Sequence, residues 1–349
     1  FDIESWHQLL EANTGGKLTV SVQAKLNGQW YKYNDFIIFV SEHPLDEWGV
    51  TYRRIAPGYE VYSALGIYQR DLSNFDEFSI FDNKDFYGMC LNCHTPNKTN
   101  PEPLVFHVRG ALGATMIQQN GKREWLQARN DALGGAMVYP YWHPSGKYCA
   151  FSTNQTHQAF HIGMEKRIEV FDQASDVFVY NVETHEMVVD TLLSGKDTWE
   201  NVPVFSPDGK TLVYVSERDG YLNLYKAEVA REEELNFTYA TLINEEPLFD
   251  DDGIERGVPK FSPDGKELAF IENRNILKVI DLKTKKVRQI TDGTQHYRND
   301  EYCFEYEWSP DGKWFALTLI SNMRDPYSDV GIVSSDGDMK IHNITESAY

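Results

Sequence analysis

Cysteine and histidine stand at a chemically informative spacing in the segment CLNCH, residues 90–94. Cys-x-x-Cys-His is the attachment signature of c-type haem, in which two thiols bind the haem covalently and the following histidine ligates the iron. The sequence therefore predicts haem c as a covalent cofactor for electron transfer. The residues expected to hold it are Cys90, Cys93 and His94.

The same two thiols are open to three other interpretations. They could form a Cys90–Cys93 disulfide in an oxidising compartment, where the chain would be an interaction module without haem. They could supply half of a zinc site, but no second cysteine pair exists, because Cys149 and Cys303 stand alone. They could be reactive thiols of thioredoxin type, but the βαβ pattern of that fold is missing.

A haem would need a second axial ligand, whose identity sets the redox potential. The nearest downstream candidates are His107 and Met116. His107 lies in the apolar stretch LVFHVRG, which also suits a histidine of the core. No amphipathic helices flank the motif, so a haem would be half-exposed or shared with neighbouring strands.

A candidate metal site is the pair His157 and His161, which would share one face of a helix. The surrounding sequence is typical of a loop between strands, which weakens that prediction. The acidic run FDDDGIERG, residues 249–257, lacks the spacing of a calcium loop and is interpreted as solvated. The sequence contains no G-x-S-x-G nucleophile elbow, so no attached α/β-hydrolase is expected.

The elements that must position these residues are indicated by a repeat. Four segments share an aromatic residue, a Ser/His-Pro-Asp/Ser-Gly-Lys turn and an alternating apolar stretch, and they begin at Tyr139, Val202, Val258 and Tyr306. Proline fixes φ, the aspartate can bond its own backbone, and glycine takes the positive φ, so each turn joins two strands of a hairpin. The strands are apolar on both faces, as in sheets packed between other sheets.

One repeat shows four short strands in succession, at 258–261, 267–271, 276–280 and 287–290. Four-stranded antiparallel sheets repeated around an axis form a β-propeller. We therefore predict an all-β fold, a single propeller domain over 1–349 with about six four-stranded blades, or alternatively seven. Residues 71–103 fit no blade pattern and are predicted to be an irregular insertion that carries the Cys-x-x-Cys-His motif.

The repeat resembles that of TolB-like β-propellers of the bacterial cell envelope, most clearly over residues 138–349. The resemblance rests on [FW]-S-P-D-G-K followed by an [LI]-A-F-type strand, as in FSPDGKELAF from Phe261. It implies a binding platform for a protein or glycan at the propeller funnel, more plausibly non-enzymatic than enzymatic. Because related propellers include oligogalacturonate lyases, a metal-dependent polysaccharide lyase or hydrolase is the alternative.

The overall charge limits the classes of partner that the chain can bind. The chain has 53 acidic and 33 basic residues, a formal net charge of −20. Nucleic-acid binding is excluded, because phosphates are neutralised by clustered Lys and Arg. No apolar run is long enough for a transmembrane helix, although a removed signal or a lipid anchor could tether the chain. The motif and the resemblance together predict a periplasmic or cell-envelope location.

Overall fold

The structure is a computed structural model, and α1 (Ile3–Glu11) is the single α-helix among the residues that it describes. This helix is too short to cross a membrane. The chain divides into two compact units, one of Phe1–Ile55 and Ala64–Tyr87, the other of Ala56–Ser63 and Gly88–Tyr349. The described residues are 2–42, 49–55, 65–71, 73–74, 76–97, 100–110, 113–126, 136–160, 168–195, 197–229, 242–250, 252–294, 305–319 and 329–345.

The first unit holds α1, two ribbons and one sheet. Asp2 begins the helix, because its carboxylate accepts a hydrogen bond from the backbone N–H of Ser5 at 2.9 Å. The turn Asn27-Gly28 has positive φ at both residues and joins the strands of the second ribbon. The ribbons are β1 (Lys17–Val20) with β4 (Phe36–Phe39), and β2 (Gln23–Leu26) with β3 (Gln29–Lys32). The sheet is β5 (Gly49–Ile55), β6 (Leu65–Asp71) and β7 (Glu77–Asp82), followed by the 3-10 helix η1 (Asn83–Phe86).

The second unit consists of five antiparallel sheets, each with four strands that pair in chain order. The first is β8 (Leu91–Asn97), β9 (Asn100–Val108), β10 (Ala114–Gln119) and β11 (Lys122–Leu126); the second is β12 (Ala136–Trp142), β13 (Tyr148–Phe160), β14 (Ile168–Asn181) and β15 (Met187–Val188). The third is β16 (Glu200–Phe205), β17 (Thr211–Ser216), β18 (Asn223–Val229) and β19 (Leu242–Pro247). The fourth is β20 (Arg256–Phe261), β21 (Glu267–Glu272), β22 (Ile276–Asp281) and β23 (Val287–Gln289); the fifth is β24 (Tyr306–Trp308), β25 (Trp314–Leu319), β26 (Asp329–Ser334) and β27 (Ile341–Asn343).

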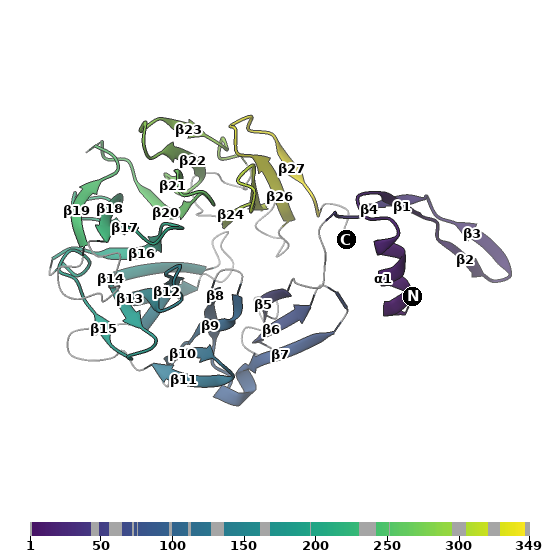
Figure 1. Cartoon of the computed structure of the whole chain (residues 1–349), viewed down its shortest axis with the longest axis horizontal. Coiled ribbons are helices and arrows are strands. Elements are labelled where there is room, and N and C mark those ends of the chain that lie inside the picture. Colours follow the sequence, from purple (N-terminus) through teal and green to yellow (C-terminus); the bar gives the residue numbers. More distant parts are fainter. Residues whose placement is uncertain are drawn as a thin grey trace. The chain divides into compact units, whose positions relative to one another are not determined.

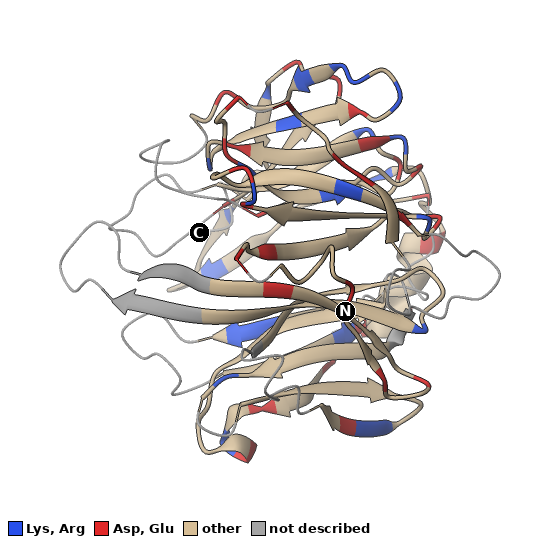
Figure 2. Ribbon diagram, turned by 90° about the vertical axis from the view of Figure 1, so that its left-hand side faces the viewer, with Lys and Arg blue, Asp and Glu red and all other residues tan. Residues whose placement is uncertain are grey.

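The core of the second unit lies between consecutive sheets. Four clusters of buried apolar side chains each draw members from two successive sheets, from the pair β8–β11 and β12–β15 to the pair β20–β23 and β24–β27. The sheets follow one another in an arc with their first strands on the inner side, as Figure 1 shows. Charged residues gather toward turns and strand ends (Figure 2), because both faces of most strands are packed. The predicted all-β propeller is confirmed.

The number and composition of the sheets follow the prediction closely. Among the described residues, five sheets have four strands, and the sheet β5-β6-β7 in the first unit has three. The segment 71–103 differs from the predicted irregular insertion, because it contains β7, η1, β8 and the start of β9. Turn residues and a β-bulge interrupt the alternation there, so the strands are hidden in the sequence. The single-domain prediction for 1–349 stays a prediction.

The turn that joins the first and second strands of a sheet has the predicted side-chain hydrogen bond and glycine conformation in the third and fourth sheets. Ser206 donates through Oγ to Asp208 at 2.6 Å, and Gly209 has a φ of 72°. Ser262 and Asp264 repeat this bond at 2.8 Å. The turn of the second sheet carries His143 in place of serine, and its Nε2 lies 3.2 Å from the carbonyl oxygen of Gly209 in the next sheet. The exception in the repeat thus bridges two sheets.

Gly209 and Gly312 occupy the same turn position in two different sheets. We expect Gly209→Ala to destabilise the protein more than Gly312→Ala. Both variants place a side chain at a φ near 70°, which costs about 1–2 kcal/mol. A Cβ at Gly209 would lie 2.3 Å from Nε2 of His143, whereas at Gly312 its nearest neighbour would be 3.7 Å away. Urea denaturation should show an additional loss of about 1 kcal/mol or more for Gly209→Ala. Equal losses would contradict the packing argument.

Candidate functional site

Buried charged side chains lie where the first strand of a sheet begins and its second strand ends, opposite the Ser-Pro-Asp-Gly turns. Glu200 in the third sheet and Arg256 in the fourth each lie seven residues before the proline of the following turn. On the neighbouring strand, Ser216 lies opposite Glu200 and Glu272 lies opposite Arg256. We call this end of the sheets the network face. Since both faces of most strands are packed, strand ends are where polar side chains can meet a ligand.

Glu200 is the buried centre of the larger cluster on the network face, with a side chain 0% exposed. It accepts hydrogen bonds from the backbone N–H of Gly195 at 3.1 Å, from Thr198 at 3.0 Å and from Ser216 at 2.9 Å. A buried carboxylate needs compensation by hydrogen bonds and opposite charge. These three donors supply the hydrogen bonds.

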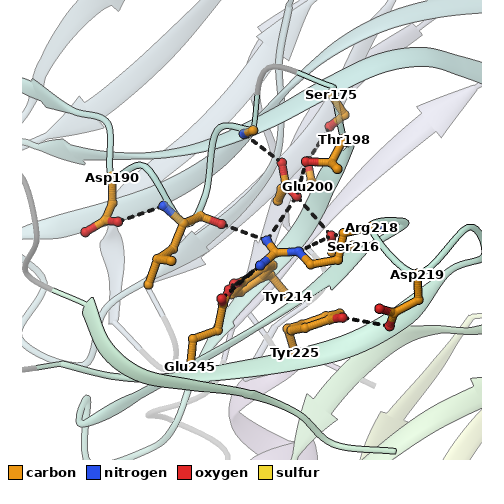
Figure 3. A network of polar contacts seen from close by, with 12 residues as sticks. Ser175, Asp190, Thr198, Glu200, Tyr214, Ser216, Arg218, Asp219, Tyr225 and Glu245 are labelled. Carbon is orange, nitrogen blue, oxygen red and sulfur yellow. Dashed lines mark hydrogen bonds and ion pairs between the residues drawn. The ribbon is translucent and has the colours of Figure 1, made fainter. Parts of the chain in front are cut away.

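Arg218 supplies the opposite charge (Figure 3). Its Nη2 lies 3.1 Å from Glu200, and its Nη1 lies 2.8 Å from both carboxylate oxygens of Glu245. The guanidinium carbon lies 4.5 Å from the ring centroid of Tyr225, which provides a cation–π contact. Arg218 also donates to the carbonyl of Leu192 and to Ser216, at 3.0 Å each. Its geometry is therefore fixed from several sides.

Glu245 is the titratable member of this network. Burial, together with the negative charges of Glu200 and Asp190, raises the pKa of Glu245 to about 7, although Arg218 lies beside it. The hydroxyl of Tyr214 also donates to this carboxylate. Glu245 can thus gain or lose a proton near neutral pH.

A smaller cluster lies on the network face of the next sheet. Arg256 is 5% exposed and forms a bidentate contact with Asp252, at 2.6 and 3.0 Å. Its Nε lies 3.5 Å from Glu272, which also contacts Lys278. The guanidinium carbon lies 4.1 Å from the ring centroid of Phe249. Two neighbouring sheets therefore each present an arginine held between carboxylates and an aromatic ring.

The chemistry open to these clusters is recognition by charge and hydrogen bonding. Their hydroxyl groups, on Ser175, Thr198 and Ser216, bond to oxygen acceptors of the network. Within the described part of the chain, no group of three or more His, Cys, Asp and Glu side chains could hold a metal ion. We interpret the network face as a binding surface.

The Cys-x-x-Cys-His motif lies at the first strand of the first four-stranded sheet. Cys90 directly precedes β8, and Cys93 and His94 lie within it. All three side chains are half-buried. Cys93 has a φ of 54°, and the pairing of β8 with β9 shifts register between Asn92 and Thr95. The second cysteine and the histidine therefore form a β-bulge.

The same bulge recurs in three later sheets. Register shifts of the first strand enclose Tyr139, Val202 and Val258, whose φ values are 48°, 49° and 52°. Each of these residues is followed by a proline, so His94 takes the position of Pro140, Pro203 and Pro259. The equivalence explains Cys93 and His94 as members of a repeated blade feature, independently of any cofactor.

A hydrogen bond between sheets supports this alignment. Trp142 donates through Nε1 to the carbonyl of Thr95 at 3.0 Å, and Trp308 donates in the same way to the carbonyl of Lys260 at 3.2 Å. Thr95 and Lys260 each follow the two bulge residues of their own strand. A tryptophan of the next sheet thus bonds to strand β8 in the same way as a tryptophan of β24 bonds to strand β20.

The candidate distal ligands lie in the core. His107, on β9, is 4% exposed, and its Nδ1 lies 3.0 Å from the hydroxyl of Thr115. Met116, on β10, is 2% exposed. Both side chains are buried within the first four-stranded sheet, and their role as axial ligands stays a prediction. Haem attachment at Cys90, Cys93 and His94 stays a prediction.

The predicted histidine pair and the acidic run have different outcomes. His161 lies outside the described residues, and His157 lies in β13, where its side chain is not described. The acidic run contributes Asp252 to the ion pair with Arg256. Sequence reasoning missed Glu200, Arg218 and Glu245. Glu200 and Arg256 share one repeat position, and comparison of charges across the repeats would have indicated them.

Comparison with known proteins places the fold. No family model matches the chain. Dipeptidyl-peptidase 5 of Porphyromonas gingivalis is 32% identical over 176 residues, covering 46% of this chain and 22% of that protein, so the chain spans less than a quarter of this relative. TolB from Acinetobacter baumannii has a TM-score of 0.56 at 15% identity, covering 98% of this chain and 82% of that chain. A Mycobacterium tuberculosis puromycin-hydrolyzing peptidase has a TM-score of 0.54 at 10% identity, covering 86% of this chain and 45% of that chain. The predicted TolB-like propeller is confirmed at the level of fold.

The raised pKa of Glu245 predicts a pH dependence of stability. Between the ordinary value of 4.5 and about 7, the folded chain holds a proton that the unfolded chain has lost. The contribution of Glu245 to stability therefore declines as pH rises through this window. The free energy of unfolding of Glu245→Gln, minus that of the unsubstituted protein, should therefore rise as pH increases from ~5 to ~8. Urea unfolding at each pH measures this difference.

Glu246→Gln is the matched control for this measurement. Lys226 lowers the pKa of Glu246, so its window lies below 4.5 and its stability difference should stay constant above pH ~5. Parallel pH profiles for the two variants would show that Glu245 titrates as an ordinary carboxyl.

We expect His94→Pro to preserve the stability of the fold, because proline follows the left-handed residue in three equivalent bulges. Where the backbone already suits proline, the substitution changes stability by less than about 1 kcal/mol. Asn92→Pro is the control, since Asn92 lies in the ladder opposite His107 and proline removes a ladder donor. Thermal unfolding should separate the two variants. A severe loss for His94→Pro alone would contradict the equivalence.

Proposed function

We propose that this propeller is a binding platform that holds a segment of polypeptide against the network face. The observation that carries the proposal is the cluster around Arg218, whose side chain is 24% exposed although it contacts two carboxylates and an aromatic ring. The N–H donors of Arg218 are used within the network, so the carboxylate of Glu245 is held in place before a ligand arrives, which lowers the entropic cost of binding.

A polypeptide is favoured over other ligands by the kind of groups presented. The partly exposed carboxylates of Glu245 and Asp252, on neighbouring sheets, match the amide donors and the charged amino terminus of an extended chain. The named relatives support this class of ligand, because dipeptidyl-peptidase 5 and the puromycin-hydrolyzing peptidase are both peptidases by name. The activity of those proteins is not transferred to this chain, which spans less than half of either.

Binding is proposed in preference to catalysis within the described residues. The hydroxyls of the network bond to oxygen acceptors, and its arginines are held in ion pairs. A polysaccharide lyase or hydrolase, and electron transfer through haem, have no comparable observation in their favour. A periplasmic or cell-envelope location remains part of the proposal, and the TolB-like fold supports it.

The proposal predicts that charge-neutral variants of the network face weaken peptide binding. Peptides selected from a random display library against the protein would be labelled and titrated by fluorescence polarisation. The double variant Glu245→Gln with Asp252→Asn should bind them at least about tenfold more weakly, which corresponds to about 1.4 kcal/mol. Both substitutions keep side-chain size and can retain hydrogen bonds.

Glu183→Gln with Glu186→Gln is the control, since these carboxylates lie in and beside the turn between β14 and β15, at the opposite end of the sheets. It removes the same charge and should leave affinity unchanged. Failure to select any binding peptide, or equal losses for the two double variants, would refute the platform at the network face.

A further inference from the structure

The hairpin of β13 and β14 is much longer than the other hairpins of the second unit. β13 has 13 residues and β14 has 14, whereas the other described strands of that unit have nine or fewer. β12 pairs with β13 only as far as Asn154, while β13 and β14 remain paired over residues 155–160 and 168–174. The hairpin therefore projects beyond the network face by five residue steps of roughly 3.4 Å, about 17 Å in all.

Along this projection, β14 has an open edge on the side that faces β15. β15 pairs with β14 only at residues 179–180, and no other described strand pairs with β14 on that side. The amide of Val177, which lies opposite Ser152, donates across this edge to the carbonyl of Leu193 at 2.8 Å. N–H groups alternate in direction along an antiparallel ladder, so the partner of every second β13 residue after Ser152 also faces the edge. Val170 is one of these partners.

The open edge begins beside the network of Arg218 (Figure 3). The chain that leaves β15 follows β14 as far as Val177 and there turns toward the network, where the carbonyl of Leu192 accepts from Arg218 at 3.0 Å. Ser175, two residues along the same strand, donates through Oγ to the carbonyl of Glu200 at 2.7 Å. A polypeptide that continued along β14 past this point would therefore have one end at the network.

The composition of the projection leaves its edge receptive. Natural proteins protect exposed strand edges with proline and lysine, among other devices. Residues 155–160 and 168–174 contain neither. A polypeptide suits such an edge better than a glycan does, because its peptide groups repeat donors and acceptors at the spacing of a strand.

We propose that the polypeptide held at the network face adds as a further antiparallel strand to the open edge of β14, with its amino terminus at Glu245. This inference rests on the proposed function and specifies how the ligand is held. The Glu245 carboxylate, which lies 2.8 Å from Arg218, receives the terminal ammonium, while main-chain groups of the ligand pair with those of β14. Since β14 runs from the tip of the projection toward the network face, a ligand that starts at the network is antiparallel to it.

Val170→Pro and Gln158→Pro are a matched pair of variants that test the edge. The two residues lie opposite each other, and their N–H groups face the two outer edges of the hairpin, so neither proline breaks the β13–β14 ladder. For peptides selected on the unsubstituted protein, Val170→Pro should raise Kd at least about tenfold, and Gln158→Pro should leave it unchanged. Circular dichroism checks that both variants are folded. Equal affinities of the two folded variants would overturn the proposal.

A second measurement leaves the protein unaltered. Each amide of a selected peptide is N-methylated in turn, and binding is titrated by fluorescence polarisation. Only alternate amides of an added strand face its neighbour, so every second N-methyl group should weaken binding at least about tenfold. A scan without this period of two would contradict strand addition.

The double variant Glu245→Gln with Asp252→Asn separates this inference from the proposed function. Weaker binding by that variant, together with a scan that lacks the period of two, would retain the platform and reject strand addition. A dimer in sedimentation velocity that Val170→Pro abolishes would show a second copy on the edge and would also reject it. Failure to select any binding peptide would reject both.

Discussion

Packing of consecutive sheets against one another is the constraint on which the rest of the second unit depends. The four core clusters are each shared by two consecutive sheets, so most strands must be apolar on both faces. Polar chemistry is therefore displaced to the ends of the strands. At one end the Ser-Pro-Asp-Gly turns close the hairpins, and at the other end the first strands begin with Glu200 and Arg256. The candidate site is the second of these ends.

Burial of charge at the network face needs close compensation. Glu200 is fully buried, and it is compensated by Arg218 and by three neutral donors. The same arginine must also serve Glu245, so one cation faces two carboxylates. Burial, together with the surplus of negative charge, keeps the pKa of Glu245 high. An additional positive or hydrogen-bonding group from a ligand would complete the balance, which is the physical basis for a binding role.

The sequence predicted the features that repeat and misjudged those that replace a repeated residue. The turns at Ser206 and Ser262 were predictable, because proline, aspartate and glycine each have a local reason to be there. The segment 71–103 was not, because Cys93 and His94 occupy a bulge that elsewhere holds Tyr-Pro or Val-Pro. Arg218 was missed because its partners come from distant positions, Glu200 and Glu245, which only the fold brings together.

The sharing of each core cluster between neighbouring sheets has a consequence for synthesis of the chain. A sheet that has just left the ribosome exposes an apolar face until the following sheet is complete, because their shared core cluster needs side chains from both sheets. The most recently made sheet is then the one most open to misassociation, and chaperones would act on that moving boundary. A pause in translation within a sheet would prolong exposure of the apolar face of the preceding sheet. A pause after a completed sheet would instead leave the outer apolar face of that new sheet exposed.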